Sequence, residues 1–300
     1  MYNFFRFLFI LFLGTLHAQD STPIVSFEFT KDNYYEKQIK ELKESINKNN
    51  VLESFDSIAN FAFKYKDWET SIEYLEKAIK ISPTSIRYFL LGGAAGFRAL
   101  EVSVFSSLKY INIMKPAFEK ALELEPNNSL FMRAQVDVLI SLPSILGGNV
   151  EKAKKIAKQI KFINPLEGLL AEGFIYEKLK NYKSAKLTYS IFFELLKQNE
   201  EICSKSFLNY LKNNRRELAY DLGKIAAEYS LSIKWGQCAL SYFLNTYKLS
   251  DTVPLAWVYY QIARLSKIEG NEIKMKENID KALSFKADYP IIENLLNKLL

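Results

Sequence analysis

Histidine is the residue type that most limits the chemistry open to this chain. The only histidine among the 300 residues is His17, close to the N-terminus. Without another histidine, the body of the chain cannot assemble a Ser/His/Asp or Cys/His catalytic set or a histidine-containing zinc site. Carboxylates alone can cleave glycosides, but only as two acids that face each other across a cleft. The acidic residues are scattered along the chain and single out no such pair, so we expect no catalytic residues, no metal site and no cofactor.

The two cysteines, Cys203 and Cys238, lie 35 positions apart. In an oxidising compartment they could form one disulfide, but a sequence separation gives no information on the distance between the two sulfurs. Two buried free thiols fit the sequence equally well. The sequence leaves both alternatives open.

The first 18 residues have the pattern of an export signal. Arg6 supplies a positive charge, the run Phe7–Leu13 is apolar, and Ala18 is a small residue before a cleavage point. A bilayer span needs about 20 apolar residues, which this run does not reach. No cysteine follows the run to carry a lipid. We therefore predict a signal peptide over 1–18 and a periplasmic or secreted protein without stable membrane insertion after cleavage; an uncleaved anchor is the alternative.

The composition favours an all-α protein. Apolar residues make up 49% of the chain, whereas glycine (11) and proline (8) are too scarce for the many turns of a β-sandwich or barrel. The formal net charge of +6 falls to +5 when the signal, whose one charged residue is Arg6, is removed. So mild an excess does not indicate a nucleic-acid partner. The densest basic stretch, Lys152 to Lys161, is predicted to be the solvated face of a helix.

Three segments of the chain end in the same pattern. In each, an apolar residue is followed three positions later by a small or aliphatic residue, and a proline stands five positions after that second residue. The segments are Tyr74–Pro83, Ala117–Pro126 and Lys155–Pro165. This spacing puts both side chains on one helix face, and the proline ends the helix because it has no N–H to continue the hydrogen-bond ladder. The prolines are 43 and 39 residues apart, so the unit that recurs is a pair of helices.

These units resemble the tetratricopeptide repeat, whose period is about 34 residues. Small residues recur where the two helices of such a repeat approach most closely, as at Gly173, Ala185, Gly223 and Ala239. The likeness implies an all-α fold, an α-solenoid of about six tetratricopeptide-like helix pairs with terminal capping helices. The predicted domains are a leader and N-terminal capping helix over 19–51, the repeat solenoid over 52–287 and a C-terminal capping helix over 288–300.

The second and third repeats, over about 85–165, are longer than the family period. In the second we expect the surplus to lie before the second helix, across Leu100–Ile113, and Pro116 to kink that helix or to mark its first turn. In the third we expect a loop. The stretch Pro143–Ala153 looks like the linker of exported bacterial tetratricopeptide proteins, some of which are likened to the T component of TRAP-type transporters.

In this family the first helix of each pair lines the binding surface, and the resemblance assigns ten residues to it. They are Asn60, Phe63, Arg87, Phe97, Arg98, Arg133, Asp137, Phe174, Tyr220 and Lys224. Rings among charges of both signs suit a protein or peptide partner, because rings supply contact area while charges fix the register. The alternative for the three arginines is pairing with carboxylates of the chain itself.

The resemblance implies a non-catalytic exported protein that binds and scaffolds a protein or peptide partner in the bacterial cell envelope. The alternative is a solute-binding accessory of a TRAP-type transporter, which would hold a small apolar ligand. An open surface favours the first function, and an enclosed apolar cavity favours the second.

Overall fold

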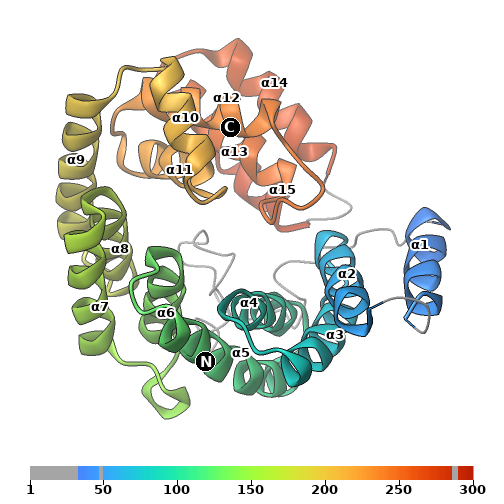
Figure 1. Cartoon of the computed structure of the whole chain (residues 1–300). Helices are drawn as coiled ribbons and strands as arrows, with labels where there is room; N and C mark the ends of the chain where they lie inside the picture. The colour runs from blue at the N-terminus through green and yellow to red at the C-terminus, as the bar shows by residue number, and fades with distance from the viewer. Residues whose placement is uncertain (1–32, 47–49, 286–289, 300) are drawn as a thin grey trace. The chain divides into compact units, whose positions relative to one another are not determined.

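The computed structural model describes residues 33–46, 50–285 and 290–299. Within these ranges all regular structure is helical (Figure 1). None of the helices described is both long and apolar enough to cross a membrane. The chain divides between Ile163 and Asn164 into two compact units, which are described one at a time. The predicted signal peptide and leader, up to residue 32, lie outside the described residues.

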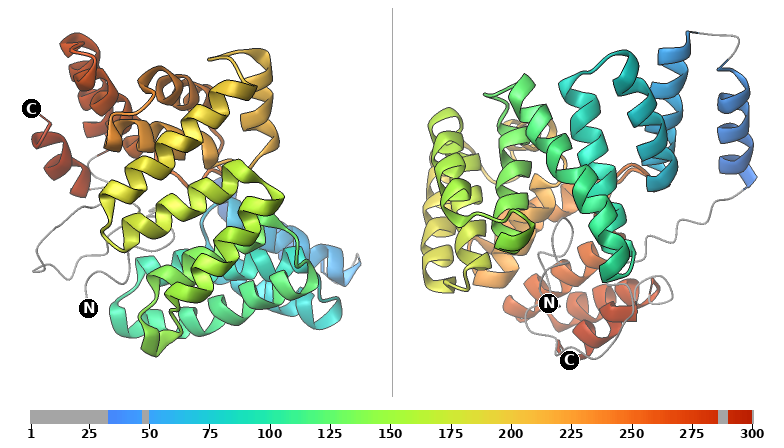
Figure 2. Two further views of the ribbon diagram at one scale, coloured as in Figure 1. Left: turned by 90° about the vertical axis from the view of Figure 1, so that its left-hand side faces the viewer. Right: turned by 90° about the horizontal axis from the view of Figure 1, so that it is seen from below.

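The first unit, Met1–Ile163, contains three helix pairs in its described part. They are α2 (Val51–Lys64) with α3 (Trp68–Ile81), α4 (Ser85–Glu101) with α5 (Val104–Leu124), and α6 (Ser129–Ser141) with α7 (Val150–Ile163). The first helices α2, α4 and α6 lie along one side of this unit and the second helices along the other (Figure 1). The pairs follow one another side by side in chain order (Figure 2).

Helix α1 (Asn33–Glu44) packs on α2 as the predicted capping helix. Its Tyr35 ring stacks on Phe61 with centroids 5.6 Å apart and lies 5.1 Å from the Tyr65 ring. The Tyr35 hydroxyl donates a 2.5 Å hydrogen bond to Asp67, the residue that caps α3. One buried tyrosine therefore joins α1 to both helices of the first pair.

The second unit, Asn164–Leu300, holds three more pairs among the residues described. They are α8 (Pro165–Lys178) with α9 (Tyr182–Asn199), α11 (Leu218–Tyr229) with α12 (Ile233–Asn245), and α13 (Leu255–Ile268) with α14 (Glu272–Leu283). Helix α15 (Pro290–Asn297) packs against α13 and α14 as the predicted C-terminal cap. The pairs and their terminal helices confirm the predicted all-α solenoid fold.

The helix boundaries follow from prolines and capping residues. Helices α3, α5 and α7 end at Ile81, Leu124 and Ile163, each two residues before the proline that the repeat pattern predicts as a stop. Asparagine or aspartate side chains accept hydrogen bonds from the first turns of α3, α6, α9 and α14, at Asp67, Asn128, Asn181 and Asn271. Each pair is thus delimited by residues that lie within a few positions of its ends.

The second pair accommodates its additional residues by lengthening both helices. The sequence predicts a surplus across Leu100–Ile113, but α4 has 17 residues, α5 has 21, and Val102 and Ser103 alone separate them. Pro116 lies inside α5 and not in its first turn. The sequence did not predict this short connection because the apolar spacing continues through both helices and does not mark the turn between them. The third pair has the predicted loop, which contains the short 3-10 helix η1 (Ser144–Leu146).

Helix α10 (Lys205–Asn213) lies between the fourth and fifth pairs and is absent from the predicted repeats. It has 9 residues, of which Phe207 and Leu211 are buried, and so short a pattern does not distinguish a helix from a loop. The Phe207 ring packs edge-on against Trp235 of α12 with centroids 4.7 Å apart. Helix α10 is therefore an addition to the second unit and not a member of a pair.

A disulfide joins Cys203, in the connection between α9 and α10, to Cys238 of α12. The two Cα atoms are 5.8 Å apart, a usual separation for bonded cysteines. Of the two alternatives that the sequence leaves open, the structure contains the bonded one. Together with the contact between Phe207 and Trp235, the bond holds α10 against α12.

Large side chains fill the space beside glycines where the two helices of a pair are closest. A Cβ atom on Gly92 of α4 would lie 2.7 Å from the buried Phe118 ring of α5. Gly223 of α11, one of the positions predicted to need a small residue, meets Leu240 of α12 in the same way. Each glycine therefore provides the room that its large partner occupies.

Alanine substitutions at Gly92 and Gly93 should have opposite effects on stability. Gly92→Ala places a methyl group against the fully packed Phe118 ring and should lower the free energy of unfolding by about 1–3 kcal/mol. Gly93→Ala meets only Phe63, at 3.7 Å, and should raise it by about 0.5–1 kcal/mol through the better helix propensity of alanine. Urea unfolding followed by circular dichroism measures both changes. Equal effects of the two substitutions would contradict the close approach at Gly92.

Removal of the disulfide should lower the free energy of unfolding by about 3 kcal/mol, because a bond across a separation of 35 residues restricts the unfolded chain. The Cys203→Ser/Cys238→Ser variant and the reduced wild-type protein should unfold at the same urea concentration. The double variant serves as the control for reductant, since it has no bond to lose. A wild-type midpoint that does not change on reduction would show that the bond contributes nothing to stability.

Candidate functional site

Arg87, the first of the three predicted arginines, is held by a carboxylate of the preceding pair. From α4 it donates two hydrogen bonds to Asp56 of α2, from Nε to Oδ1 at 2.8 Å and from Nη2 to Oδ2 at 2.6 Å. A third runs from Nη1 to the Ser82 carbonyl oxygen at 2.6 Å. The hydrogen bond to Asp56 raises the pKa of the guanidinium. With its side chain 14% exposed, Arg87 links the first helices of two successive pairs.

Arg98, near the end of α4, lies in a larger polar cluster with residues of α3 and α5. Its Nε is 3.0 Å from Glu69 Oε1 and its Nη1 is 3.3 Å from Glu101 Oε2. The Tyr110 hydroxyl also donates to Glu69, and Trp68 Nε1 donates to Glu101 Oε1 at 2.8 Å. The cluster therefore ties α3, α4 and α5 together through two carboxylates.

The two carboxylates of this cluster have opposite pKa shifts. Burial raises the pKa of Glu101 to about 7, and the hydrogen bonds from Trp68 and Arg98 offset that rise only in part. Burial would also raise the pKa of Glu69, but the hydrogen bonds from Tyr110 and Arg98 outweigh it and lower the pKa. Glu101 therefore changes charge near neutral pH, whereas Glu69 stays ionised there.

The other candidates of the first unit are mostly packed as well. Arg133 of α6 is buried, and its Nε donates to Asp137 Oδ1 at 2.9 Å. The Phe97 ring stacks on Trp68 with centroids 4.7 Å apart, and Phe63 meets Trp68 edge-on at 5.1 Å. The pairing that the sequence leaves open as an alternative for the three arginines is thus present in the structure. Asn60 of α2, in contrast, is exposed.

The three candidates in the second unit lie in its interior. Phe174 of α8 and both Tyr220 and Lys224 of α11 are buried. Lys224 Nζ lies 3.5 Å from Glu177 Oε2, and the Tyr229 hydroxyl donates a 3.0 Å hydrogen bond to the other oxygen of that carboxylate. Burial raises the pKa of Tyr220. These side chains join α8 to α11 and offer little area to a partner.

A row of accessible side chains remains on each first helix of the first unit. We name these residues the first-helix face: Asn60 and Lys64 of α2, Ile86 and Leu90 of α4, and Leu130 and Asp137 of α6. Within each helix they are four or seven positions apart and therefore share one side. Arg87 holds α4 to α2, and the Phe89 ring of α4 lies 4.8 Å from the Phe131 ring of α6, so the three rows are neighbours.

Ile86 and Leu130 belong to this face although the sequence does not predict them. They are 52% and 37% exposed, but an apolar residue inside a repeat is interpreted first as core. In α4 the charged residues Arg87, Arg98 and Glu101 recur on one side of the helix, and Ile86 lies beside that side and not on it, so the polar pattern does not reveal Ile86 as exposed. In α6 the available signal is Asp137, because it is seven positions after Leu130 and marks the same side as accessible.

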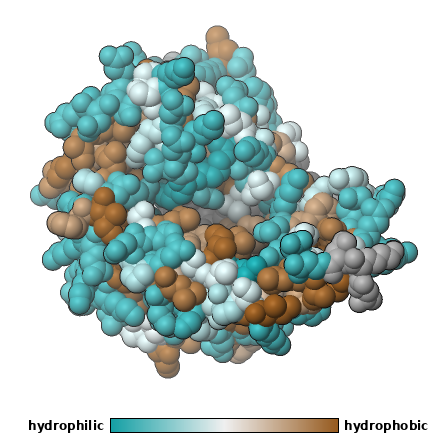
Figure 3. Space-filling model, viewed as in Figure 1, coloured by the Kyte–Doolittle hydropathy of each residue, from teal (hydrophilic) through white to brown (hydrophobic). Residues whose placement is uncertain are grey.

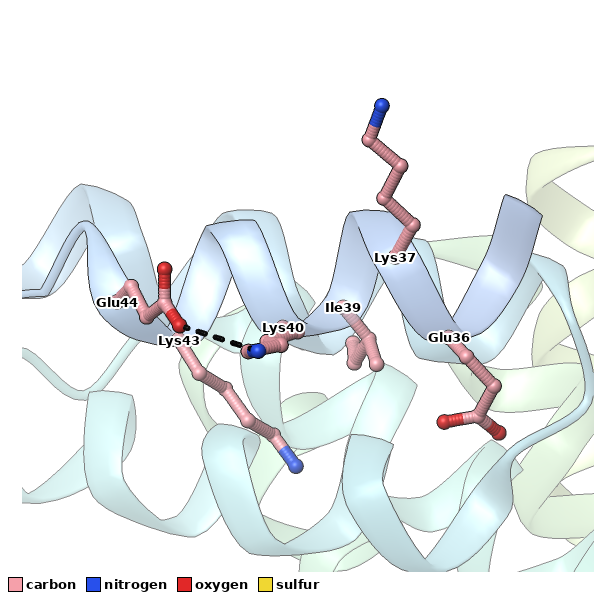
Figure 4. A pocket seen from close by; sticks show the side chains of 6 residues that line it. All are labelled: Glu36, Lys37, Ile39, Lys40, Lys43 and Glu44. Carbon is pink, nitrogen blue, oxygen red and sulfur yellow. Dashed lines mark ion pairs between the residues drawn. The ribbon is translucent and has the colours of Figure 1, made fainter. Parts of the chain in front are cut away.

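A shallow open hollow lies along α1 (Figure 4). It is lined by Glu36, Lys37, Ile39, Lys40, Lys43 and Glu44. Ile39 points toward the helices beneath α1, Lys37 points away from them, and Lys40 pairs with Glu44 at 3.9 Å. Charged side chains around one isoleucine do not make the enclosed apolar pocket that a small solute would need. Across the part of the chain that the structure describes, no three His, Cys, Asp or Glu residues are grouped so as to hold a metal ion.

Comparison with known proteins agrees with this architecture. The sequence matches the tetratricopeptide repeat family model over residues 100–128. The crystal structure of a tetratricopeptide repeat protein from Parabacteroides merdae, determined at 2.39 Å resolution, has a similar fold with a TM-score of 0.51. The two sequences are 12% identical, and the likeness covers 89% of this chain and 94% of that one. No curated protein matches the chain.

The sequence match and the fold confirm the resemblance to tetratricopeptide repeat proteins. At 12% identity the structural likeness shows the fold alone. Repeats of this type generally form non-catalytic scaffolds, and they indicate a role in interactions between proteins. The class of protein defined by the fold and the sequence match is therefore a helical repeat protein.

Replacing Glu101 by glutamine should change how stability depends on pH. The carboxyl titrates near 4.5 in the unfolded chain and near 7 in the folded protein, so its contribution to stability is lost as the pH rises between these values. Glu101→Gln removes this loss. Its free energy of unfolding relative to wild type should therefore rise by up to about 3 kcal/mol across that range, as measured by urea unfolding at a series of pH values.

Glu69→Gln is the matched control for this experiment. The lowered pKa of Glu69 keeps its carboxylate ionised above about pH 5, so the effect of the substitution should not vary with pH in that range. A constant difference between Glu101→Gln and wild type from pH 5 to 8 would mean that Glu101 is ionised throughout, contrary to the effect of its burial.

Proposed function

We propose that this protein is a non-catalytic scaffold, exported to the bacterial cell envelope, that binds a protein or peptide partner on the first-helix face. The observation that carries the proposal is the combination on three neighbouring helices of exposed Ile86 and Leu130 with the exposed polar side chains of Asn60 and Lys64. Apolar side chains supply contact energy, and polar side chains beside them set the direction and register of the bound segment.

The arrangement of this face suits a short extended segment. Its side chains come from three successive first helices, which are linked by the Arg87 to Asp56 hydrogen bonds and by the contact between the Phe89 and Phe131 rings. Exposed side chains on the drawn face of the molecule are likewise a mixture of apolar and polar ones (Figure 3). A mixed surface without a deep pocket is typical of protein partners and not of small solutes.

Two observations support export. The first is the pattern of residues 1–18, a short apolar run behind a positive charge. The second is the bond between Cys203 and Cys238, because disulfides persist in oxidising compartments such as the periplasm. Fractionation of cells, with N-terminal sequencing of the purified protein, tests the proposal. A mature protein that begins at Gln19 and contains the oxidised pair is expected; a reduced cytoplasmic protein that retains Met1 would contradict it.

The absence of catalysis is supported by the distribution of polar residues. His17 is the only histidine of the sequence, and the clustered acids of the first unit, Glu69 and Glu101, are engaged by Arg98, Trp68 and Tyr110. Groups engaged in this way stabilise the packing of α3, α4 and α5 and are not free to face a substrate.

Partner capture tests the use of the first-helix face. The purified protein is immobilised and exposed to envelope extract, alongside the variant Lys64→Glu/Ile86→Glu. The control variant, Lys80→Glu/Leu124→Glu, places the same charges at exposed positions of the second helices α3 and α5. We expect the captured partner to decrease by about ten-fold or more with the first variant and to be unchanged with the control. Equal capture by both variants would show that the partner binds elsewhere.

A further inference from the structure

Helix α7 carries most of the net charge of the chain. Its 14 residues include five lysines and one glutamate, a formal charge of +4, whereas the whole chain has +6. The glutamate, Glu151, pairs with Lys154 at 2.8 Å. Glu151 is the single carboxylate of α7, so the lysines outnumber the acids on this helix by five to one.

Lysines of α7 lie on the same side of the helix as an exposed phenylalanine. Ala153, Ile156, Ala157 and Ile160 form the buried side of α7, which packs on α6. Lys155, Lys158 and Phe162 are spaced three and four positions apart on the side opposite to it and are all exposed. The Phe162 side chain is 93% exposed, so nearly all of its apolar surface is in contact with water. A basic helix face therefore ends in an aromatic ring that is exposed in the part of the chain that the structure describes.

The loop before α7 also exposes an apolar side chain. Ile145, in η1, is 92% exposed, and the Lys115 side chain of α5 lies against Gly147 in the same loop. Both ends of α7 are thus marked by an exposed apolar residue, and a further cation lies close to its start.

We propose that the basic face of α7, defined as Lys152, Lys155, Lys158 and Phe162, adsorbs the protein to an anionic lipid membrane. The lysines would lie near the charged headgroups, and the Phe162 ring would enter the interfacial region of the bilayer. This contact is peripheral and leaves the first-helix face, on α2, α4 and α6, free for a partner. It does not depend on the proposed function.

A membrane fits this face better than an acidic protein segment. A protein partner would need a pocket shaped to receive the projecting Phe162 ring, whereas a fluid lipid interface accepts an isolated aromatic side chain without a preformed site. Lysines along one helix face also suit a surface of diffuse negative charge, because they make no fixed bidentate contacts. Each lysine near such a surface strengthens binding about five-fold, an effect that salt screens.

Sedimentation with lipid vesicles tests the proposal. The purified protein is mixed with vesicles of phosphatidylcholine alone or with added phosphatidylglycerol, at low and high salt. The Lys155→Glu/Lys158→Glu variant should bind the anionic vesicles at least about ten-fold more weakly than wild type. The control, Lys37→Glu/Lys40→Glu, makes the same charge change at the same spacing on α1, where three lysines are balanced by three glutamates, and its binding should stay within about two-fold of wild type.

A second pair of variants tests the ring. Phe162→Ser should weaken vesicle binding about ten-fold, because the apolar surface that enters the interface is lost. Phe105→Ser removes a ring that is 89% exposed on α5 and should have no effect. Since both rings are exposed, neither substitution should disturb folding, which circular dichroism verifies.

Three results would overturn the proposal. The first is equal binding to neutral and anionic vesicles, and the second is equal loss with the α7 variants and their controls. The third is binding of soluble poly-glutamate that requires Lys155 and Lys158 while vesicle binding does not, which would assign the face to an acidic protein partner.

Discussion

The packing of a large side chain into the room left by a glycine is the contact on which the close approach of α4 to α5 and of α11 to α12 depends. Phe118 against Gly92 and Leu240 against Gly223 bring two helices close enough for their apolar sides to exclude water. Such contacts lie within a pair, so the packing of one pair depends mainly on residues close together in the sequence. Successive pairs need further ties, and the Arg87 to Asp56 and Trp68 to Glu101 hydrogen bonds provide two of them in the first unit.

These polar ties explain why charge on a first helix does not by itself indicate a binding site. The carboxylate of Asp56 and the guanidinium of Arg87 are both partly withdrawn from water, and each would be left uncompensated if the other were lost. An arginine that pairs with a carboxylate of the neighbouring repeat can occupy the same position on a first helix as an arginine that binds a ligand. Exposed apolar residues such as Ile86 are the better guide to the surface, because burial of their area remains available to a partner.

The helix pairs could be predicted from the sequence because their determinants are local. The proline two residues after the end of α3, α5 and α7 and the apolar spacing of three and four positions are each visible within one short segment. The candidate site could not be predicted in the same way. Whether Arg87 meets a partner or Asp56 depends on the distance between residues 31 positions apart, and no local pattern encodes it. Helix α10 was not predicted because its 9 residues are too few to show a helical period in the apolar positions.

Only the second of the two units needs a disulfide to reach its final structure. Both cysteines lie in Asn164–Leu300, so the first unit needs no oxidation step to complete its folded structure. Cys203 precedes Cys238 by 35 residues, and the chain emerges from its N-terminus, so Cys203 must wait until α11 and α12 have been made. Oxidation is therefore a late event in the maturation of the second unit, and a change in the redox state of the surroundings acts on the covalent structure of that unit alone.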